Sequence, residues 1–258
     1  MKYGSRQSSS FESYSALAKA EKNATVRVGR RPEDASKEPA IWSDMVAKVR
    51  VARGERGLDI GCGSGVLAKL WCEEVQAADL TLTLIDFPAP LARLRQELTA
   101  SELSRVELVA GGFPDYLPSP LPAESYDFIV MYSVIHYADD PMALIDPAVA
   151  LLRPGGRLLV GDIPNFSRKG RFLATPAGRA FDAEYHDIPV SDAPYYKTHQ
   201  EFVAAQRASG TVVIDDAIML HKVAYWRDRG MDVYILPQPA SLPFSFTRED
   251  LLIVRPGA

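Results

Sequence analysis

Arg56-Gly-Leu-Asp-Ile-Gly-Cys-Gly-Ser-Gly65 is the most informative segment of the chain. A short apolar run ends in three glycines at alternate positions, and Val66, Leu67 and Leu70 then follow at the spacing of one helical face. Glycine lets a backbone turn sharply and lets a ligand approach the main chain. The start of the next helix offers unpaired amides to an anionic group. The stretch therefore predicts a strand, a ligand-binding loop and a helix.

Strands alternate with helices downstream of this loop. Apolar runs predict four further strands of the main sheet, at residues 80–87, 106–111, 126–135 and 157–163. Helices are expected at about 141–152, where Arg153-Pro-Gly-Gly156 is a stop signal, and at about 215–229. Two last strands, 232–237 and 250–255, lie close enough to form a hairpin. The expected fold class is α/β, a doubly wound and mostly parallel sheet of seven strands with a C-terminal reversed hairpin.

Two segments do not follow this alternation. Residues 1–40 are polar and are expected to form a helical cap, in which Ser9 and Glu12 can form a capping box. A second helix is expected at about 41–51. Between residues 164 and 211 the periodicity breaks down, and this insertion after the fifth strand is too long for an ordinary connection. It is expected to cap the acceptor side of the site. We expect a single domain over residues 1–258.

Composition excludes several classes of partner. The chain has 29 basic and 33 acidic residues and a formal net charge of −4, so no polyanion-binding surface and no nucleic-acid partner are expected. No apolar run reaches the roughly 18 residues of a membrane span, and a cytoplasmic protein without a membrane partner is expected. Cys62 and Cys72 would lie about 15 Å apart on a helix, so they predict free thiols and no metal site. An oligomer stays possible.

An acidic residue at the end of the second strand points to the ligand. Asp86 lies about 20 positions after the glycine loop, where a carboxylate can bind both hydroxyls of a ribose. Loop and carboxylate together favour an adenosine-containing ligand. The dinucleotide pattern G-x-G-x-x-G, counted from Gly61, fails at Val66, although counting from Gly63 gives Ala68 at the last position. A nicotinamide enzyme therefore stays open as a second interpretation.

The motifs resemble those of one family. Leu58-Asp-Ile-Gly-Cys-Gly-Ser-Gly65 resembles the first motif of class I S-adenosylmethionine-dependent methyltransferases. Asp86 resembles their second-strand acid, and Leu151-Leu-Arg-Pro-Gly-Gly-Arg-Leu-Leu159 resembles their entry to the fifth strand. The last two strands resemble their reversed hairpin. The resemblance covers roughly residues 41–163 and 212–256, and it implies a Rossmann-like fold with S-adenosyl-L-methionine as the cofactor.

The resemblance also implies roles for single residues. Asp59 and Gly61 would hold the methionine amine, and Asp86 would bind the ribose hydroxyls beside an adenine that contacts Phe87. The complete expected cofactor set is Asp59, Gly61, Gly63, Gly65, Asp86, Phe87, Phe113 and Ser133. The family often has an acid after the third strand for the adenine amino group, but this sequence reads Ala110-Gly-Gly-Phe113. That contact must come from backbone atoms or from Asp115, or be absent.

Candidates for catalysis and acceptor binding lie outside the glycine loop. His136 follows the fourth strand, where sheets of this type bind ligands, and is the candidate general base; a packed or cofactor-adjacent histidine is the alternative. Arg168 and Arg171 are expected to bind a phosphate or carboxylate on the acceptor, unless they form a solvated helix start. His199 is expected at the substrate. Tyr14 is a further candidate for acceptor binding, and its helix is expected to close over the cofactor or to pack on the sheet edge.

These candidates favour a methyltransferase acting on a small molecule. A histidine beside the fourth strand fits O-methylation best, because an alcohol needs a base as its proton leaves. A sugar or a phosphorylated metabolite is the expected acceptor. Two alternatives remain: an NAD-dependent oxidoreductase or epimerase, which Val66 and the lack of a Tyr-x-x-x-Lys pair argue against, and a non-catalytic cofactor-binding partner subunit.

Overall fold

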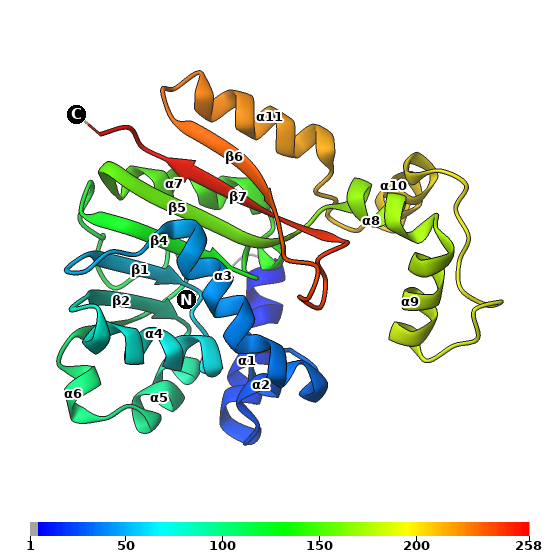
Figure 1. The fold of residues 1–258 in the computed structure, drawn as a ribbon. Helices are drawn as coiled ribbons and strands as arrows, with labels where there is room; N and C mark the ends of the chain where they lie inside the picture. Colours follow the sequence, from blue (N-terminus) through cyan, green and yellow to red (C-terminus); the bar gives the residue numbers. More distant parts are fainter. Residues whose placement is uncertain (1–4, 258) are drawn as a thin grey trace.

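A seven-stranded sheet forms the centre of the protein (Figure 1). The computed structural model describes residues 5–257, with side chains from Ser9 onward. The strands are β1 Arg56–Ile60, β2 Thr81–Asp86, β3 Val106–Ala110, β4 Tyr126–Tyr132, β5 Leu152–Pro164, β6 Asp232–Pro237 and β7 Arg248–Val254. They lie in the order β3-β2-β1-β4-β5-β7-β6. Strands β1 to β5 are parallel, and β7 runs antiparallel to both β5 and β6. The expected fold class and the terminal hairpin are confirmed.

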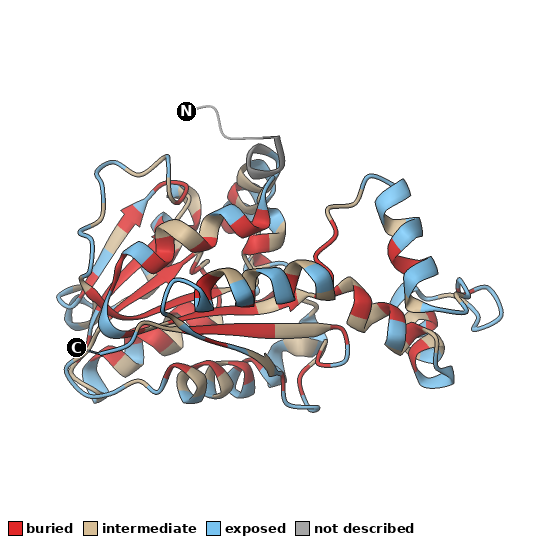
Figure 2. Cartoon of the chain, turned by 90° about the horizontal axis from the view of Figure 1, so that it is seen from above, coloured by how far each residue is buried: buried red, intermediate tan, exposed pale blue. Residues whose placement is uncertain are grey.

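Helices cover both faces of the sheet. The α-helices are α1 Ser5–Ala20, α2 Ala24–Arg27, α3 Glu38–Val49, α4 Val66–Ala77, α5 Pro88–Glu97, α6 Ala100–Leu103, α7 Ile145–Ala150, α8 Phe166–Leu173, α9 Pro176–His186, α10 His199–Ala208 and α11 Asp216–Arg227. Short 3-10 helices are η1 Pro32–Lys37, η2 Ile135–Tyr137 and η3 Pro141–Leu144. One buried cluster joins α3, α4 and α5 to the sheet, and another joins α7 and α11 to the opposite face. In Figure 2 the buried residues accordingly follow the strands.

The middle of the sheet depends on close packing between β1 and β4. Phe128 on β4 stacks on Trp71 of α4 with ring centroids 5.4 Å apart. A Cβ atom at Gly57 on β1 would lie 2.2 Å from the Phe128 ring, so only glycine leaves room for this ring. Both aromatic side chains are fully buried. The Phe128 ring therefore packs between Gly57 of β1 and Trp71 of α4, the strand and the helix on either side of the glycine loop.

Several element boundaries differ from the expectations. Helix α1 begins at Ser5, so Ser9 lies inside the helix and no capping box forms there. Strand β4 ends at Tyr132, because Ser133 has a left-handed backbone with φ of 61° and the chain then forms a 3-10 turn. The Pro-Gly-Gly segment after α7 lies within β5.

Residues 164–211 are helical rather than irregular. Helices α8, α9 and α10 form a lobe that projects beyond the tips of the strands (Figure 1). Asn165, Thr175 and Thr198 each accept a hydrogen bond from the first turn of the helix that follows. Three short capped helices carry too few apolar residues for a clear periodicity, which explains why the sequence predicts no helix in this segment.

Three further observations concern the part of the chain that the structure describes. Cys62 and Cys72 are buried free thiols, as expected. Within residues 5–257, no helix is long and apolar enough to cross a membrane. The described residues also contain no group of His, Cys, Asp and Glu side chains that could hold a metal ion.

Candidate functional site

The glycine loop forms the wall of a cavity at the carboxyl end of the sheet. Gly61 and Gly63 have left-handed backbones with φ of 76° and 67°, conformations that an L side chain rarely adopts. A Cβ atom at Gly61 would lie 2.5 Å from Val134, and one at Gly63 would lie 2.8 Å from Val28. Gly65 caps the start of α4. Glycine is therefore required by the backbone at two of these positions and by close packing at both.

Two buried acids lie at the ends of β1 and β2. The Asp86 carboxylate accepts hydrogen bonds from the backbone N–H groups of Gly63 (2.7 Å) and Phe87 (2.6 Å), which fix its orientation. Burial raises the pKa of Asp86 to about 6, against the effect of these two bonds. Burial and the neighbouring Asp86 raise the pKa of Asp59 to about 8. Within the described residues, no hydrogen bond or ion pair is made to the Asp59 carboxylate.

These acids make the cavity suitable for a positively charged ligand group. An acid that is buried without a cation has a raised pKa, and a bound ammonium group would restore its charged form. The amine of S-adenosylmethionine has the required charge, and Asp86 keeps lone pairs for ribose hydroxyls. The residues present therefore fit this cofactor. Asp59 would hold the amine and Asp86 the ribose.

All eight residues expected at the cofactor line this one cavity. They are Asp59, Gly61, Gly63, Gly65, Asp86, Phe87, Phe113 and Ser133. Asp115, a possible partner for the adenine amino group, does not line it, whereas Gly111 and Gly112 do. Backbone atoms of these two glycines and of Phe113 are therefore the candidates in this cavity for contact with the adenine amino group.

The N-terminal segment closes over this cavity. Phe11 packs edge-on against Phe87, with ring centroids 5.2 Å apart. The Tyr14 hydroxyl donates a hydrogen bond of 2.6 Å to the hydroxyl of Tyr137, and burial raises the pKa of Tyr14. Tyr14 and Val28 line the cavity. Tyr14 was expected at the acceptor, but it lies on the cofactor side.

His136 lines a second cavity that adjoins the first. The two cavities share Val28, Arg30, Tyr132, Ser133 and Tyr137. The second cavity receives side chains from the segment before α3, from the end of β4, and from the loop between β6 and β7. Of the insertion 164–211, only Tyr185 contributes to its lining among the described residues. The loop between β6 and β7 was not expected at the site.

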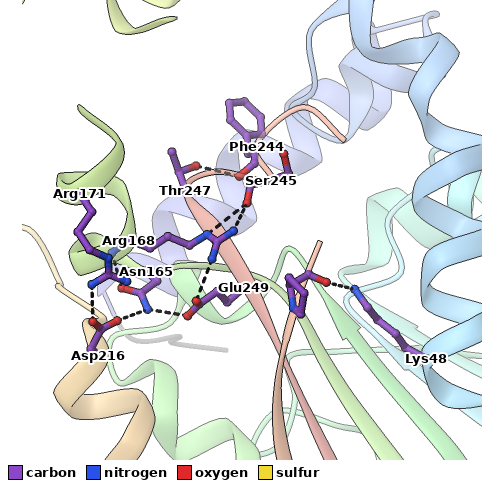
Figure 3. Close-up of polar contacts among 10 residues, drawn as sticks. Lys48, Asn165, Arg168, Arg171, Asp216, Phe244, Ser245, Thr247 and Glu249 are labelled. Atoms are coloured by element: carbon purple, nitrogen blue, oxygen red, sulfur yellow. Dashed lines mark hydrogen bonds and ion pairs between the residues drawn. The ribbon is translucent and has the colours of Figure 1, made fainter. Parts of the chain in front are cut away.

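Arg168, Arg171 and His199 line neither cavity. Arg168 donates hydrogen bonds to the Ser245 carbonyl and forms an ion pair with Glu249 at 3.3 Å. Arg171 forms an ion pair with Asp216 at 2.5 Å. Figure 3 shows both arginines turned toward these partners, which join α8 to β7 and to α11. Their contacts hold the lobe on the sheet, and so differ from the expected acceptor binding.

His199 has a position in the lobe itself. It begins α10, and its backbone and Cβ lie against Gly170 of α8, where an added Cβ would come within 3.0 Å. The histidine therefore belongs to the contact between these two helices, away from both cavities.

Asp162 is a residue of the second cavity that the sequence reasoning missed. It lies near the end of β5 with a left-handed backbone, φ of 58°, and accepts a hydrogen bond of 2.7 Å from the Ser133 hydroxyl. Ser133 is itself left-handed, so two adjacent strands carry strained non-glycine residues that bond to each other. Such strain is concentrated at functional sites. The strand-end argument that selected Asp86 also applies to Asp162 and could have found it.

Residues 58–158 match a family model described as a methyltransferase domain. The match includes the glycine loop, both acids, His136 and the start of β5. Together, the family model, the curated relatives and the solved structures support a class I S-adenosylmethionine-dependent methyltransferase family for this chain. S-adenosylmethionine is the cofactor of this family, as expected.

Two relatives of this methyltransferase family have related sequences. The chain is 29% identical over 106 residues to the ubiquinone biosynthesis O-methyltransferase of Aliivibrio fischeri, covering 41% of this chain and 42% of the relative. It is 31% identical over 131 residues to the 27-O-demethylrifamycin SV methyltransferase of Amycolatopsis mediterranei, covering 51% and 44%. The matched part thus spans less than half the length of these curated relatives.

A solved methyltransferase has the same fold. The structure of a SAM dependent methyltransferase from Aquifex aeolicus covers 94% of this chain and 98% of its own, with a TM-score of 0.55 and 14% identity. At this identity the likeness concerns the fold alone.

Proposed function

We propose that the protein transfers the methyl group of S-adenosylmethionine to a hydroxyl group of a small molecule bound in the second cavity. The observation that carries the proposal is the pair of adjoining cavities with five shared lining residues. A cofactor in the first cavity would have a neighbour in the second across Ser133 and Tyr137. Methyl transfer needs this arrangement, because both reactants must lie side by side.

The names of the two relatives support the choice of acceptor. One relative is named as an O-methyltransferase, and the other is named by an O-demethyl substrate. Both names refer to a small molecule. Because each match spans less than half of the relative, the names support the class of acceptor and not its identity.

Each part of the chain has a task in the proposed reaction. When bound, the cofactor supplies an activated methyl group on a sulfonium centre. Asp59 and Asp86 bind and orient its amine and ribose. Phe11 and Tyr14 cover the first cavity, and the hydrogen bond from the Tyr14 hydroxyl to Tyr137 connects this cover to η2. The cover excludes water from the reacting groups.

His136 is the proposed acceptor of the proton that leaves the hydroxyl. It lies in η2, directly after β4, and lines the second cavity close to the residues shared with the first. An imidazole can take a proton near neutral pH, which suits a general base. Asp162, on the neighbouring strand end, lines the same cavity and can orient the hydroxyl through a hydrogen bond.

A methyl-transfer screen tests the proposal. Radiolabelled S-adenosylmethionine is incubated with the protein and a panel of hydroxylated small molecules, both neutral and acidic, and labelled product is counted. We expect at least one hydroxylated compound to be labelled, with formation of S-adenosylhomocysteine. Gly63→Val serves as the inactive control. Labelling of amines or thiols alone would contradict O-methylation, and binding of the cofactor without any transfer would favour a partner subunit.

A further inference from the structure

The second cavity carries more positive than negative side chains. Arg30, Arg31 and Arg248 line it, against two acids, Asp34 and Asp162. The arginines come from two segments far apart in the sequence, the stretch before η1 and the start of β7. Three guanidinium groups in one cavity repel each other unless an anion lies between them.

Arg30 has unused hydrogen-bond donors. Its side chain is only 17% exposed, and its one ion pair among the described residues is with Glu38, at 3.8 Å. Glu38 is fully buried, and burial raises the pKa of Glu38 even though Arg30 lowers it. A guanidinium group has five N–H donors, and burying donors without partners is unfavourable. An oxyanion in the cavity would supply the missing acceptors.

The other two guanidinium groups are held in place by backbone carbonyls and by nearby carboxylates, since Arg31 also forms an ion pair with Glu33 at 3.8 Å. Arg248 donates to the backbone carbonyl of Asp162 at 3.3 Å, and its Nε lies 3.9 Å from the carboxylate of that residue. Arg31 lies 3.9 Å above the Tyr185 ring and donates 2.6 Å to the Tyr185 carbonyl. Both retain N–H groups for a ligand. The acid Asp162 is itself engaged by Ser133 and offsets only part of the charge.

We propose that the acceptor carries an oxyanion, a phosphate or a carboxylate, and that Arg30 and Arg248 bind it in the second cavity with Arg31 at the rim. This inference rests on the proposed function. Arginine binds both groups with two parallel hydrogen bonds, which fix direction as well as distance. The arginines bind the anionic end of the acceptor, and the reacting hydroxyl of the acceptor faces His136 and Asp162. The arginines thus select acidic acceptors over neutral ones of the same shape.

Calorimetry with small anions tests the arginine site. Inorganic phosphate and acetate are titrated at constant ionic strength into the protein saturated with S-adenosylhomocysteine. We expect at least one anion to bind. The anion with the higher affinity indicates whether the acceptor carries a phosphate or a carboxylate. Arg30→Gln and Arg248→Gln should each weaken binding about tenfold or more. Arg171→Gln, outside both cavities and the candidate that sequence suggested, should leave it unchanged.

A second measurement uses the wild-type protein, so that the proposal can be tested even if a variant fails to fold. Phenylglyoxal modifies accessible arginines, and mass spectrometry identifies the modified positions. Phosphate should protect Arg30 and Arg248 but not Arg171. Lack of binding by both anions, equal binding in all variants, or equal labelling with and without phosphate would overturn the proposal.

Failure of this inference is distinguishable from failure of the proposed function. S-adenosylhomocysteine that binds while phosphate and acetate do not leaves methyl transfer intact and removes the arginine site. If S-adenosylhomocysteine itself does not bind, the proposed function fails, and the same titrations without it still decide whether the arginines hold an anion.

Discussion

The two cavities adjoin each other but differ in their balance of charge. Two acids and two arginines line the first, where Arg27 is paired with Glu97, whereas two acids and three arginines line the second, with Arg30 common to both. The floor of the first holds Asp59 and Asp86, whose raised pKa values follow from burial without a cation. The second holds three arginines and fewer acids. The difference separates the two reactants: one cavity suits a ligand with an ammonium group, the other an acceptor with an anion. Ser133 and Tyr137 form the boundary at which they would meet.

The largest effect is expected for Gly63→Val. A β-branched side chain opposes the left-handed backbone at this position and meets Val28 within the first cavity, so binding of S-adenosylhomocysteine should be lost. Calorimetry measures it. Gly54→Val is the matched control, because Gly54 has a similar φ of 80° but no atom within 4 Å of the added Cβ. An unchanged dissociation constant for Gly63→Val would remove the loop from the cofactor site.

His136→Ala tests the second cavity without touching the first. With an acceptor from the screen, the single-turnover rate should fall about a hundredfold or more, whereas affinity for S-adenosylhomocysteine should barely change. His221→Ala, an exposed histidine on α11, is the control and should leave both unchanged. If rate and affinity fall together, His136 belongs to the cofactor site. If neither changes, the proton leaves by another route.

Asp86→Ala tests the acid at the end of β2. Loss of this buried hydrogen-bond partner should weaken the binding of S-adenosylhomocysteine by roughly 1–3 kcal/mol. Part of the effect comes from the N–H groups of Gly63 and Phe87, which lose their acceptor. Asp228→Ala, an exposed acid at the end of α11, should have no effect. Equal affinity in wild type and Asp86→Ala would contradict the ribose assignment.

The raised pKa of Asp59 predicts a pH-dependent affinity. Below its pKa of about 8 this acid is protonated in the free protein, and binding an ammonium group requires the carboxylate. Binding then releases a proton, so affinity for S-adenosylhomocysteine should rise about tenfold per pH unit between pH 6 and 7. Asp59→Asn should flatten this dependence. A pH-independent affinity in the wild type would show that Asp59 does not meet the amine.

Tyr14→Phe should have the smallest effect. It removes the hydroxyl bond of 2.6 Å to Tyr137 and leaves the ring in place. A hydrogen bond of this kind contributes about 0.5–1.5 kcal/mol, so the affinity should fall a few-fold. Tyr234→Phe, on an exposed position of β6, is the control. A loss as large as that of Asp86→Ala would mean that the whole cover depends on this bond.

The cofactor residues of the first cavity could be predicted from sequence, whereas His136 was the one residue of the second cavity predicted for catalysis. The glycine loop, Asp59 and Asp86 occupy fixed positions relative to strands with clear apolar runs, so local pattern placed them. Arg30, Asp162 and Arg248 come from three separate segments, and only tertiary packing brings them together. Arg168 and Arg171 had the residue type required for anion binding, but partners in other elements engage them.

The same difference between local pattern and tertiary packing explains which expectations about the fold were wrong. Strands buried on both faces give long apolar runs, which are readable in sequence. The helices of the lobe depend on caps such as Thr175 and Thr198 and on contacts between α8 and α10. Such contacts leave little periodicity in a short helix. The bend at Ser133 depends on its bond to Asp162, 29 residues away, and no local pattern predicts it.

Calorimetry of the wild-type protein with S-adenosylhomocysteine and with NAD+ tests whether the first cavity binds the S-adenosylmethionine skeleton through Asp59 and Asp86. Titrations at pH 7 in two buffers of different ionisation enthalpy should show S-adenosylhomocysteine binding at one site with release of a proton, and no saturable heat from NAD+. Binding of NAD+ without binding of S-adenosylhomocysteine would contradict the account.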